Sequence, residues 1–231
     1  MIEIKNLKYN YAGSKHTVFE GFNLSLSENC IYGLLGKNGI GKSTLLYLIS
    51  GLLRPKGGTI TFDGFDTSKR RPETLQEIFI VPEEYDMPKM SLTECIKIYR
   101  SFYPHFSEDV LRKCLADFEL PGDVDLKALS MGQKKKVYMS VALAAGTKLL
   151  LMDEPTNGLD IPSKSLFRKV VANNMTDDRI LIISTHQVHD VESLLDHIMI
   201  LDNSRLLMNE AVADITDKYS FTFRQPAEMD Q

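Results

Sequence analysis

The chain has 231 residues, of which 43% are apolar and 25% are charged, so it can bury a sizeable core and has neither a disordered nor a fibrous composition. Its net charge of −4 argues against a protein whose main task is to hold a nucleic-acid backbone. The three cysteines, Cys30, Cys95 and Cys114, show no C-x-x-C spacing, which favours a reduced, cytosolic chain over a disulfide framework or a zinc site.

The N-terminal sequence lacks the basic start and apolar stretch of a secretory signal. The longest apolar runs, residues 149–152 and 180–183, fall far short of the roughly 18 residues that a membrane-spanning helix needs. We therefore expect that the chain does not cross a membrane by itself.

The first third of the chain predicts strands followed by one helix. Apolar and polar residues alternate over residues 2–5 and 22–26, which indicates two half-buried antiparallel strands with a turn near Gly13. A continuous apolar run over residues 31–35 predicts a buried strand, and residues 45–49 have helical character. The local order is strand, glycine-rich loop, helix.

The middle of the chain changes from strands to helices. Residues 59–62 and 78–81 predict two more strands. Residues 91–103 and 107–118 carry apolar positions at three- and four-residue spacing, which predicts two helices. We expect these helices to belong to a helical subdomain that spans residues 85–146.

The last third returns to strands. Residues 149–152 and 180–183 are apolar throughout and each is followed by a helix-like segment, as in parallel α/β sheets that are buried on both faces. Residues 198–201 and 206–208 predict a closing pair of strands, and residues 224–231 have the composition of a frayed tail.

The glycine-rich loop at residues 36–43 matches the pattern G-x-x-x-x-G-K-S. Its glycines let the backbone curl around a phosphate, so that amides beside a helix N-terminus point at the phosphate oxygens. Lys42 would bring a positive charge to the β and γ phosphates, and the Ser43 hydroxyl would be a Mg²⁺ ligand. The candidate nucleotide-binding residues of this loop are Gly36, Asn38, Gly39, Gly41, Lys42, Ser43 and Thr44. A plain glycine-rich turn is the alternative, and the loop alone does not separate GTPases, kinases and helicases.

Two acidic residues, Asp153 and Glu154, follow the apolar run at residues 149–152. They would lie at the carboxyl end of a buried parallel strand, where such a sheet opens its ligand crevice. We expect Asp153 to orient Mg²⁺ and Glu154 to polarise the attacking water as a catalytic residue. An acidic pair in a solvated turn is the alternative, and the phosphate loop upstream makes it the weaker one.

Three further motifs resemble those of the ABC ATPase family. Residues 129–133, Leu-Ser-Met-Gly-Gln, resemble the signature L-S-G-G-Q, residues 157–160 resemble the D-loop, and His186 after an apolar run resembles the switch histidine. The resemblance covers roughly residues 1–217. It implies an α/β fold of the P-loop NTPase type, an ABC cassette with a mixed central sheet, an N-terminal antiparallel β subdomain and an inserted α-helical subdomain.

The same resemblance implies a division of the chain and of its site. The core and β subdomain would be residues 1–84 and 147–217, the helical subdomain residues 85–146 would carry the signature, and residues 218–231 would form a tail. The signature residues Ser130, Gly132 and Gln133 would bind ATP held by a second cassette in a head-to-tail dimer, most simply a homodimer, although a heterodimer is open. Asp160 would lie at the dimer seam.

Other roles implied by the family fall on His186, Lys42 and Tyr11. His186 and Lys42 would join Glu154 as the catalytic residues, and Tyr11 would stack on the adenine of ATP, with Tyr9 as the alternative. Each also has a plain structural interpretation: Ser130 as a helix N-cap, His186 as a surface or core histidine, and Tyr11 as a packed aromatic residue.

Three features depart from the family pattern or stand outside it. Glu83 stands where the family usually has a glutamine that meets Mg²⁺, and a carboxylate can still serve this ion. Its added negative charge predicts a stronger dependence on the divalent cation. Met131 replaces a glycine in the signature, and we expect activity to survive. The run Lys134, Lys135 and Lys136 predicts a solvated helix face, with an acidic partner or lipid headgroups as the alternative.

The Pro-Glu-Glu loop at residues 82–84 and the run Gln-Lys-Lys-Lys at residues 133–136 resemble the bacterial exporter-type branch of the family more than its nutrient importers. The leading hypothesis is an ATPase subunit that uses ATP and Mg²⁺ to power transport, with export as the direction, through a separate integral membrane permease. It would lie peripherally at the cytoplasmic face of the cell membrane and bind no nucleic acid. A soluble ABC ATPase that acts on ribosomes or DNA is the alternative. A third hypothesis is a nucleotide-binding regulatory module with little ATP turnover.

Overall fold

The computed structural model describes residues 1–85, 90–122, 125–126 and 128–218. The tail expected at residues 218–231 lies outside the described part except for Lys218, which ends a helix. In the described part, no helix is long and apolar enough to cross a membrane.

A mixed six-stranded sheet forms the centre of the molecule, in the order β10-β9-β3-β8-β7-β6. Its strands are β3 (Ile31–Leu35), β6 (Ile78–Val81), β7 (Leu149–Asp153), β8 (Ile180–Thr185), β9 (His197–Asp202) and β10 (Arg205–Ala211). All neighbours are parallel except β10, which pairs antiparallel with β9. The predicted parallel sheet and its closing pair are confirmed.

The continuous apolar runs of β3, β7 and β8 reflect burial of both faces of this sheet. Alternate residues of a strand point to opposite faces, and in β7 Leu149 and Leu151 pack into one apolar cluster whereas Leu150 and Met152 pack into the other. The central strands therefore have no polar face, because each face of the sheet is covered by its own core.

A four-stranded antiparallel sheet precedes the mixed one in the chain, in the order β2-β1-β4-β5. Its strands are β1 (Ile2–Tyr9), β2 (Phe19–Leu26), β4 (Gly57–Phe62) and β5 (Phe65–Asp66). A register shift between Ile4 and Leu7, with Asn6 at a φ of 50°, moves the buried positions from even to odd residue numbers. This bulge explains why the alternation predicts only the first half of β1.

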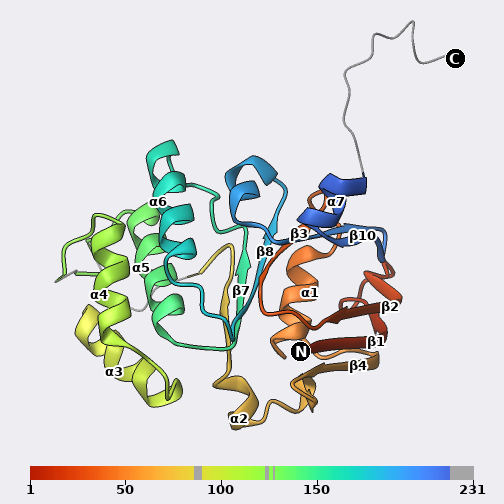
Figure 1. The fold of residues 1–231 in the computed structure, drawn as a ribbon. Coiled ribbons are helices and arrows are strands. Elements are labelled where there is room, and N and C mark those ends of the chain that lie inside the picture. The colour runs from red at the N-terminus through yellow and green to blue at the C-terminus, as the bar shows by residue number, and fades with distance from the viewer. Residues whose placement is uncertain (86–89, 123–124, 127, 219–231) are drawn as a thin grey trace, which may run out of the picture.

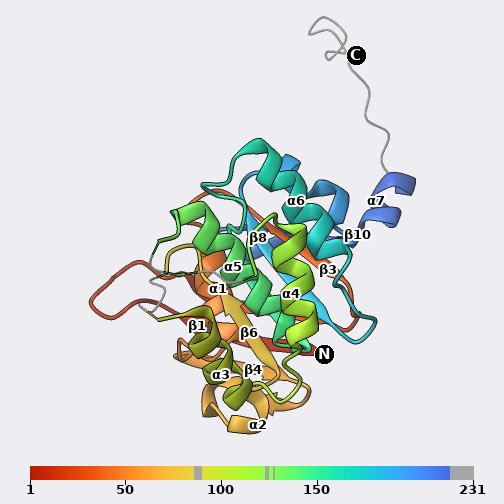
Figure 2. The same cartoon turned by 90° about the vertical axis from the view of Figure 1, so that its left-hand side faces the viewer.

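Helices cover both faces of the mixed sheet (Figure 1). The helices of the described part are α1 (Lys42–Ile49), α2 (Pro72–Leu75), α3 (Leu92–Phe102), α4 (Glu108–Asp117), α5 (Met131–Ala144), α6 (Ile161–Ala172) and α7 (Val212–Lys218), with short 3-10 helices at Thr67–Lys69, Val188–Asp190 and Glu192–Leu194. Helix α1 lies between the two sheets, and α5 and α6 lie on the other face of the mixed sheet. The quarter-turn view shows α3 and α4 at the outer side of α5 (Figure 2).

The helical region begins with two well-capped helices. Ser91 accepts the Glu94 amide in a capping box, and Ser107 accepts the Val110 amide, so α3 and α4 begin next to the predicted residues. The buried side chains of α4 and α5 join the same apolar cluster as Leu150 of β7. The helical region thus shares its core with one face of the sheet, and the boundaries at residues 85 and 146 stay a prediction.

Candidate nucleotide-hydrolysis site

The glycine-rich loop joins β3 to α1, as the order strand, loop, helix predicts. Helix α1 begins at Lys42, earlier than predicted, because Gly41 serves as its N-cap with a φ of 111°. A Cβ atom at Gly41 would lie 2.9 Å from Val18 Cγ1, and Gly39 has a φ of 77° with open space around it. Both positions therefore need glycine, and the loop exposes Lys37, Asn38 and Gly39 to solvent as a phosphate cradle would.

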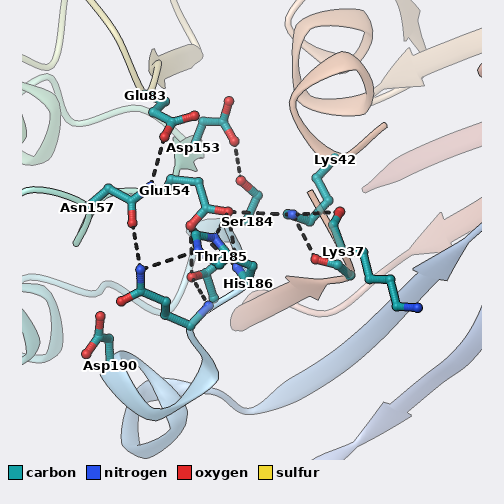
Figure 3. A network of polar contacts seen from close by, with 12 residues as sticks. Lys37, Lys42, Glu83, Asp153, Glu154, Asn157, Ser184, Thr185, His186 and Asp190 are labelled. Carbon is teal, nitrogen blue, oxygen red and sulfur yellow. Dashed lines mark hydrogen bonds and ion pairs between the residues drawn. The ribbon is translucent and has the colours of Figure 1, made fainter. Parts of the chain in front are cut away.

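Lys42 directs its ammonium group back over this loop. The Nζ atom donates to Gly36 O at 2.8 Å and to Lys37 O at 3.3 Å. It also forms a 3.5 Å ion pair with Glu154 Oε1, and both side chains are only 5% exposed. The loop lysine and the predicted catalytic carboxylate are thereby brought together at the end of β7 (Figure 3).

Asp153 ends β7 as a buried carboxylate. The hydroxyl of Ser184 on β8 donates to Asp153 Oδ1, and Oδ2 is buried without a hydrogen-bond partner among the described residues. Burial raises the pKa of Asp153, the hydroxyls of Ser184 and Ser43 lower it, and the nearby carboxylates of Glu83 and Glu154 raise it further. The structure thus brings Ser43 and Asp153 together, as the Mg²⁺ prediction requires.

Glu154 starts the turn after β7 and is held by groups from two other elements. Its backbone is left-handed, with a φ of 43°, and its amide donates to Ser184 O at 3.0 Å. Oε2 accepts the Thr185 hydroxyl at 3.0 Å, and Oε1 lies 2.8 Å from His186 Nδ1. Figure 3 shows the carboxylate between Lys42 and the end of β8. A carboxylate fixed from both sides is suited to orient a water molecule for attack.

His186 is linked to Glu83 through two amide side chains. Gln187 Nε2 lies 3.4 Å from His186 Nε2 and donates to Asn157 Oδ1 at 3.1 Å, and Asn157 Nδ2 donates to Glu83 Oε1 at 2.8 Å. Lys164 donates to Gln187 Oε1 and so fixes the orientation of that amide. His186 Nε2 is then an acceptor, and in the neutral ring the proton on Nδ1 is donated to Glu154.

The residues near Asp153 fit a magnesium ion. Asp153 has a free, buried carboxylate oxygen, Ser43 offers a hydroxyl, and Glu83 adds a solvent-exposed carboxylate within electrostatic reach. Mg²⁺ binds one or two carboxylates and completes its shell with waters and substrate phosphates, so these oxygen donors are of the kind it prefers. A bound ion would neutralise phosphate charge and draw these carboxylates together.

Tyr11 and Thr44 lie together beside the loop. The Tyr11 hydroxyl and Thr44 Oγ1 are 2.8 Å apart, and the Tyr11 ring is 44% exposed, whereas Tyr9 is buried in the core. Tyr9 meets Tyr11 edge-on at 5.2 Å between ring centroids. Tyr11 is therefore the more accessible ring for a base, and its stacking on adenine stays a prediction.

The signature residues lie at the start of α5, on the opposite side of β7 from α1 (Figure 1). Ser130 is the N-cap and forms a capping box with Gln133, so the predicted cap is confirmed. Met131 is 84% exposed, and a Cβ atom on Gly132 would meet only Gly158 O, at 3.9 Å. Among the described residues, the side chains of Ser130 and Gln133 hydrogen-bond with each other's backbone amides and not with the Gly36 to Ser43 loop.

Asp160, predicted at the dimer seam, is an exposed N-cap. Its carboxylate accepts the Ser163 amide at 2.9 Å and so begins α6. The hydroxyl and amide of Ser163 lower the pKa of Asp160. Asp160 is the last residue of the D-loop, and the first, Asn157, donates a hydrogen bond to Glu83 Oε1.

The prediction of a solvated lysine face is wrong for Lys135. Lys134 and Lys136 are partly exposed, but Lys135 is 6% exposed and its ammonium group donates to Glu154 O and Asn157 O. Helical spacing was the available signal, because Lys135 shares a face of α5 with the buried Met139 and Ala142, four and seven residues later.

Sequence reasoning also missed the roles of Thr185, Gln187 and Asn157 in holding Glu154 and His186. The polar residues at the end of β8 and just after it were the signal for Thr185 and Gln187, since the carboxyl ends of β7 and β8 meet at one edge of the sheet. The pairing of Asn157 with Glu83 joins residues 74 positions apart and has no local signal.

The chain is similar to known ATP-binding proteins of transporters. The family model described as ABC transporter matches residues 19–157. The ABC transporter ATP-binding protein YtrB of Bacillus subtilis is 29% identical over 95% of this chain and 75% of its own length. The lantibiotic transport ATP-binding protein SrtF of Streptococcus pyogenes is 29% identical over 91% of this chain and 90% of its own.

The fold agrees as well. A solved structure titled as the ATP binding subunit of an ABC transporter superposes with a TM-score of 0.81 at 24% identity, over 94% of this chain and 92% of that one. The family match covers more than half of the chain and includes the phosphate loop, the signature and the Asp153–Glu154 pair. The chain therefore belongs to the ABC transporter family and is an ATP-binding, ATP-hydrolysing subunit of the transporter type.

Proposed function

We propose that this ATPase powers export of a substrate through a separate integral membrane permease, and that it works as a head-to-tail dimer of cassettes. The observation that carries the dimer is the division of the site within one chain. Lys42, Asp153 and Glu154 are buried together at the end of β7, whereas Ser130 is exposed at the start of α5. A signature that binds phosphate has to meet it on a second cassette.

In this proposal each site residue has a defined role in binding or hydrolysing ATP. Lys42 and the amides of the loop bind the phosphates of ATP, and Ser43, Asp153 and Glu83 hold Mg²⁺. Glu154 accepts a proton from the attacking water, and His186 orients Glu154 through Nδ1. To contact the γ phosphate, His186 Nε2 has to carry a proton and turn from the Gln187 amide to the phosphate oxygen. Tyr11 stacks on adenine, and Ser130, Gly132 and Gln133 of the second cassette close over the γ phosphate from a helix N-terminus.

An exposed apolar patch supports a protein partner at the helical region. Ile98 and Phe102 lie one turn apart on α3 and are 44% and 67% exposed. Exposed apolar side chains that share one helix face are typical of protein contacts. We propose that the permease binds there and holds the chain at the cytoplasmic face of the membrane. Export as the direction rests on the similarity of the Glu83 loop and the lysine run to the exporter branch.

Capture of the partner tests this function. A tagged chain purified from detergent-solubilised membranes should retain one integral membrane protein, which stimulates ATP hydrolysis by the chain. The variant Phe102→Asp changes an exposed side chain of the proposed docking patch. It should fold normally but no longer retain the membrane protein. Reconstituted with that partner, the chain should drive substrate away from the side that receives ATP.

Two results would contradict the proposal. Recovery of ribosomes or DNA in place of a membrane protein would favour the soluble alternative. Transport toward the side that receives ATP would leave the ATPase assignment intact and overturn export.

A further inference from the structure

Lys135 is a buried lysine to which the proposed catalytic scheme gives no role. It lies one turn after Ser130 in α5 and is 6% exposed. Burial lowers its pKa, and the carboxylates of Glu83, Glu154 and Asp153 oppose that shift. Among the described residues, no carboxylate oxygen lies within ion-pair distance of its ammonium group. A buried ammonium group is costly unless its hydrogen bonds are satisfied, so its partners must matter.

Those partners are two carbonyl groups of one turn. Lys135 Nζ donates to Glu154 O at 3.0 Å and to Asn157 O at 2.9 Å. The same turn is closed by the Asn157 amide, which donates to Glu154 O at 3.2 Å. Lys135 therefore holds both ends of the turn formed by residues 154–157. Glu154, with its carboxylate, begins this turn, and Asn157, the first residue of the D-loop, ends it.

This turn has a backbone that needs support. Glu154 is a non-glycine residue with a φ of 43°, a conformation that side chains disfavour. Its carboxylate is fixed by Thr185, His186 and Lys42, none of which holds its carbonyl group. Lys135 contributes the support from the carbonyl side.

Lys135 also connects two parts of the cassette. Lys135 belongs to the helix whose first residues are the signature, and the site that a Cβ on Gly132 would occupy is 3.9 Å from Gly158 O of the D-loop. The start of α5 and residues 154–158 therefore form one contiguous unit. A shift of α5 would move the Glu154 turn through Lys135.

We propose that Lys135 is a positioning residue for hydrolysis. It ties the signature helix to the Glu154 turn and so holds the Glu154 carboxylate where it can activate the attacking water. The inference rests on the ATPase activity of the site and is independent of the direction of transport. It predicts a role in turnover rather than in nucleotide affinity, because Lys135 bonds to the turn and not to the phosphate loop.

Lys135→Met tests the proposal, since it keeps an unbranched side chain that is one atom shorter and removes the charge and the donors. The kcat for ATP should fall about ten- to a hundredfold, as small displacements of catalytic groups do. The Kd for a fluorescent ATP analogue should change less than about twofold. Lys135→Arg, which keeps charge and donors, should recover part of the loss, and the matched control Lys134→Met should behave as the parent chain.

Hydrogen exchange supplies a second readout. In Lys135→Met the amides of residues 154–159 should exchange faster, with those of Ile31–Leu35 unchanged. A kcat within about twofold of the parent chain would overturn the proposal. Parallel loss of kcat and affinity without rescue by Lys135→Arg would also overturn it, because that is a general structural role. If Lys135→Met does not fold, Lys135→Gln replaces it, and a parental kcat in that variant overturns the proposal equally.

Discussion

The two parts of the nucleotide machinery differ sharply in how this chain holds them. The carboxylate of Glu154 is almost inaccessible and is held by Lys42, Thr185 and His186. At the signature, Met131 is 84% exposed, and Ser130 has its cap as a local partner. The Glu154 carboxylate has all its contacts within the chain, whereas Ser130 and Met131 of the signature are exposed to solvent.

This difference shows which interactions a single cassette can supply. Buried polar groups need partners within the fold, and the Glu154 network has them. The exposed signature needs none to be stable, because Ser130 and Gln133 satisfy each other in the capping box. In the proposed dimer these exposed residues would meet the phosphate of a second cassette, so changes to the buried network and to the signature should have different effects.

The largest expected effect is on the buried side. Glu154→Gln keeps the shape of the side chain and removes the base, so kcat should fall by roughly 10²- to 10⁴-fold. Binding of ATP should be retained, because the loop and Lys42 are unchanged. Steady-state phosphate release and a binding titration on the same preparation measure both quantities.

The exposed Glu192→Gln serves as the matched control for that variant, because Glu192 lies on a surface 3-10 helix with a 59% exposed side chain. It should hydrolyse ATP as the parent chain does. A parent chain no faster than Glu154→Gln would remove the catalytic role of Glu154 and favour a regulatory module with little turnover.

The next effect tests the exposed side across the proposed dimer. Ser130→Asp keeps a good N-cap for α5 but puts a negative charge where phosphate should bind. The kcat/KM for ATP should fall at least about tenfold through charge repulsion. Ser130→Asn, a neutral cap of similar size, is the control for the charge.

Mixing sharpens this test. A chain with Ser130→Asp and a chain with Glu154→Gln are each expected to be nearly inactive alone. In mixed head-to-tail dimers one site combines an unaltered Glu154 with an unaltered Ser130, so a 1:1 mixture should recover about a quarter of the parental activity. No recovery, with mixed dimers shown to form, would contradict a signature that acts in trans.

Much of the fold follows from the sequence because its signals are local. The apolar runs of β3, β7 and β8 lie where predicted, and Ser91 and Ser107 mark the starts of α3 and α4. The second half of β1 could not be predicted from alternation, because the bulge at Asn6 reverses it. The two-residue strand β5 and the one-turn helix α2 are too short for a periodic pattern to indicate them.

The candidate site divides in the same way. Motifs indicated Lys42, Asp153, Glu154 and His186, and the structure brings Lys42, Glu154 and His186 into direct contact. The links that hold them were not predictable, because they join distant parts of the chain. Asn157 bonds to Glu83, and Lys135 bonds across 19 residues to Glu154.

A smaller effect is expected at Glu83, the exposed carboxylate near Asp153 that we propose as a Mg²⁺ ligand. Glu83→Gln keeps an acceptor for Asn157 Nδ2 and removes one negative charge near Asp153. Affinity for ATP without metal should rise about three- to tenfold because less repulsion remains, while affinity with Mg²⁺ should change less. Titrations in EDTA and in Mg²⁺ measure the ratio, and Glu84→Gln, also exposed, is the control. An unchanged ratio would show that Glu83 has no part in handling the metal.

The smallest effect is expected at Met131, where the comparison between the two sides is most direct. This side chain is 84% exposed and begins α5, so Met131→Gly should change the free energy of unfolding by no more than about 0.5 kcal/mol. Any change in kcat then reports on a contact with another cassette, and we expect it to stay below about threefold because Ser130 and Gly132 are unchanged. Leu207→Ala, at an exposed position on β10, controls for loss of surface apolar area. A large loss of kcat with unchanged stability would place the methionine itself in the closed interface, and the exposed side would then contribute packing as well as phosphate contacts.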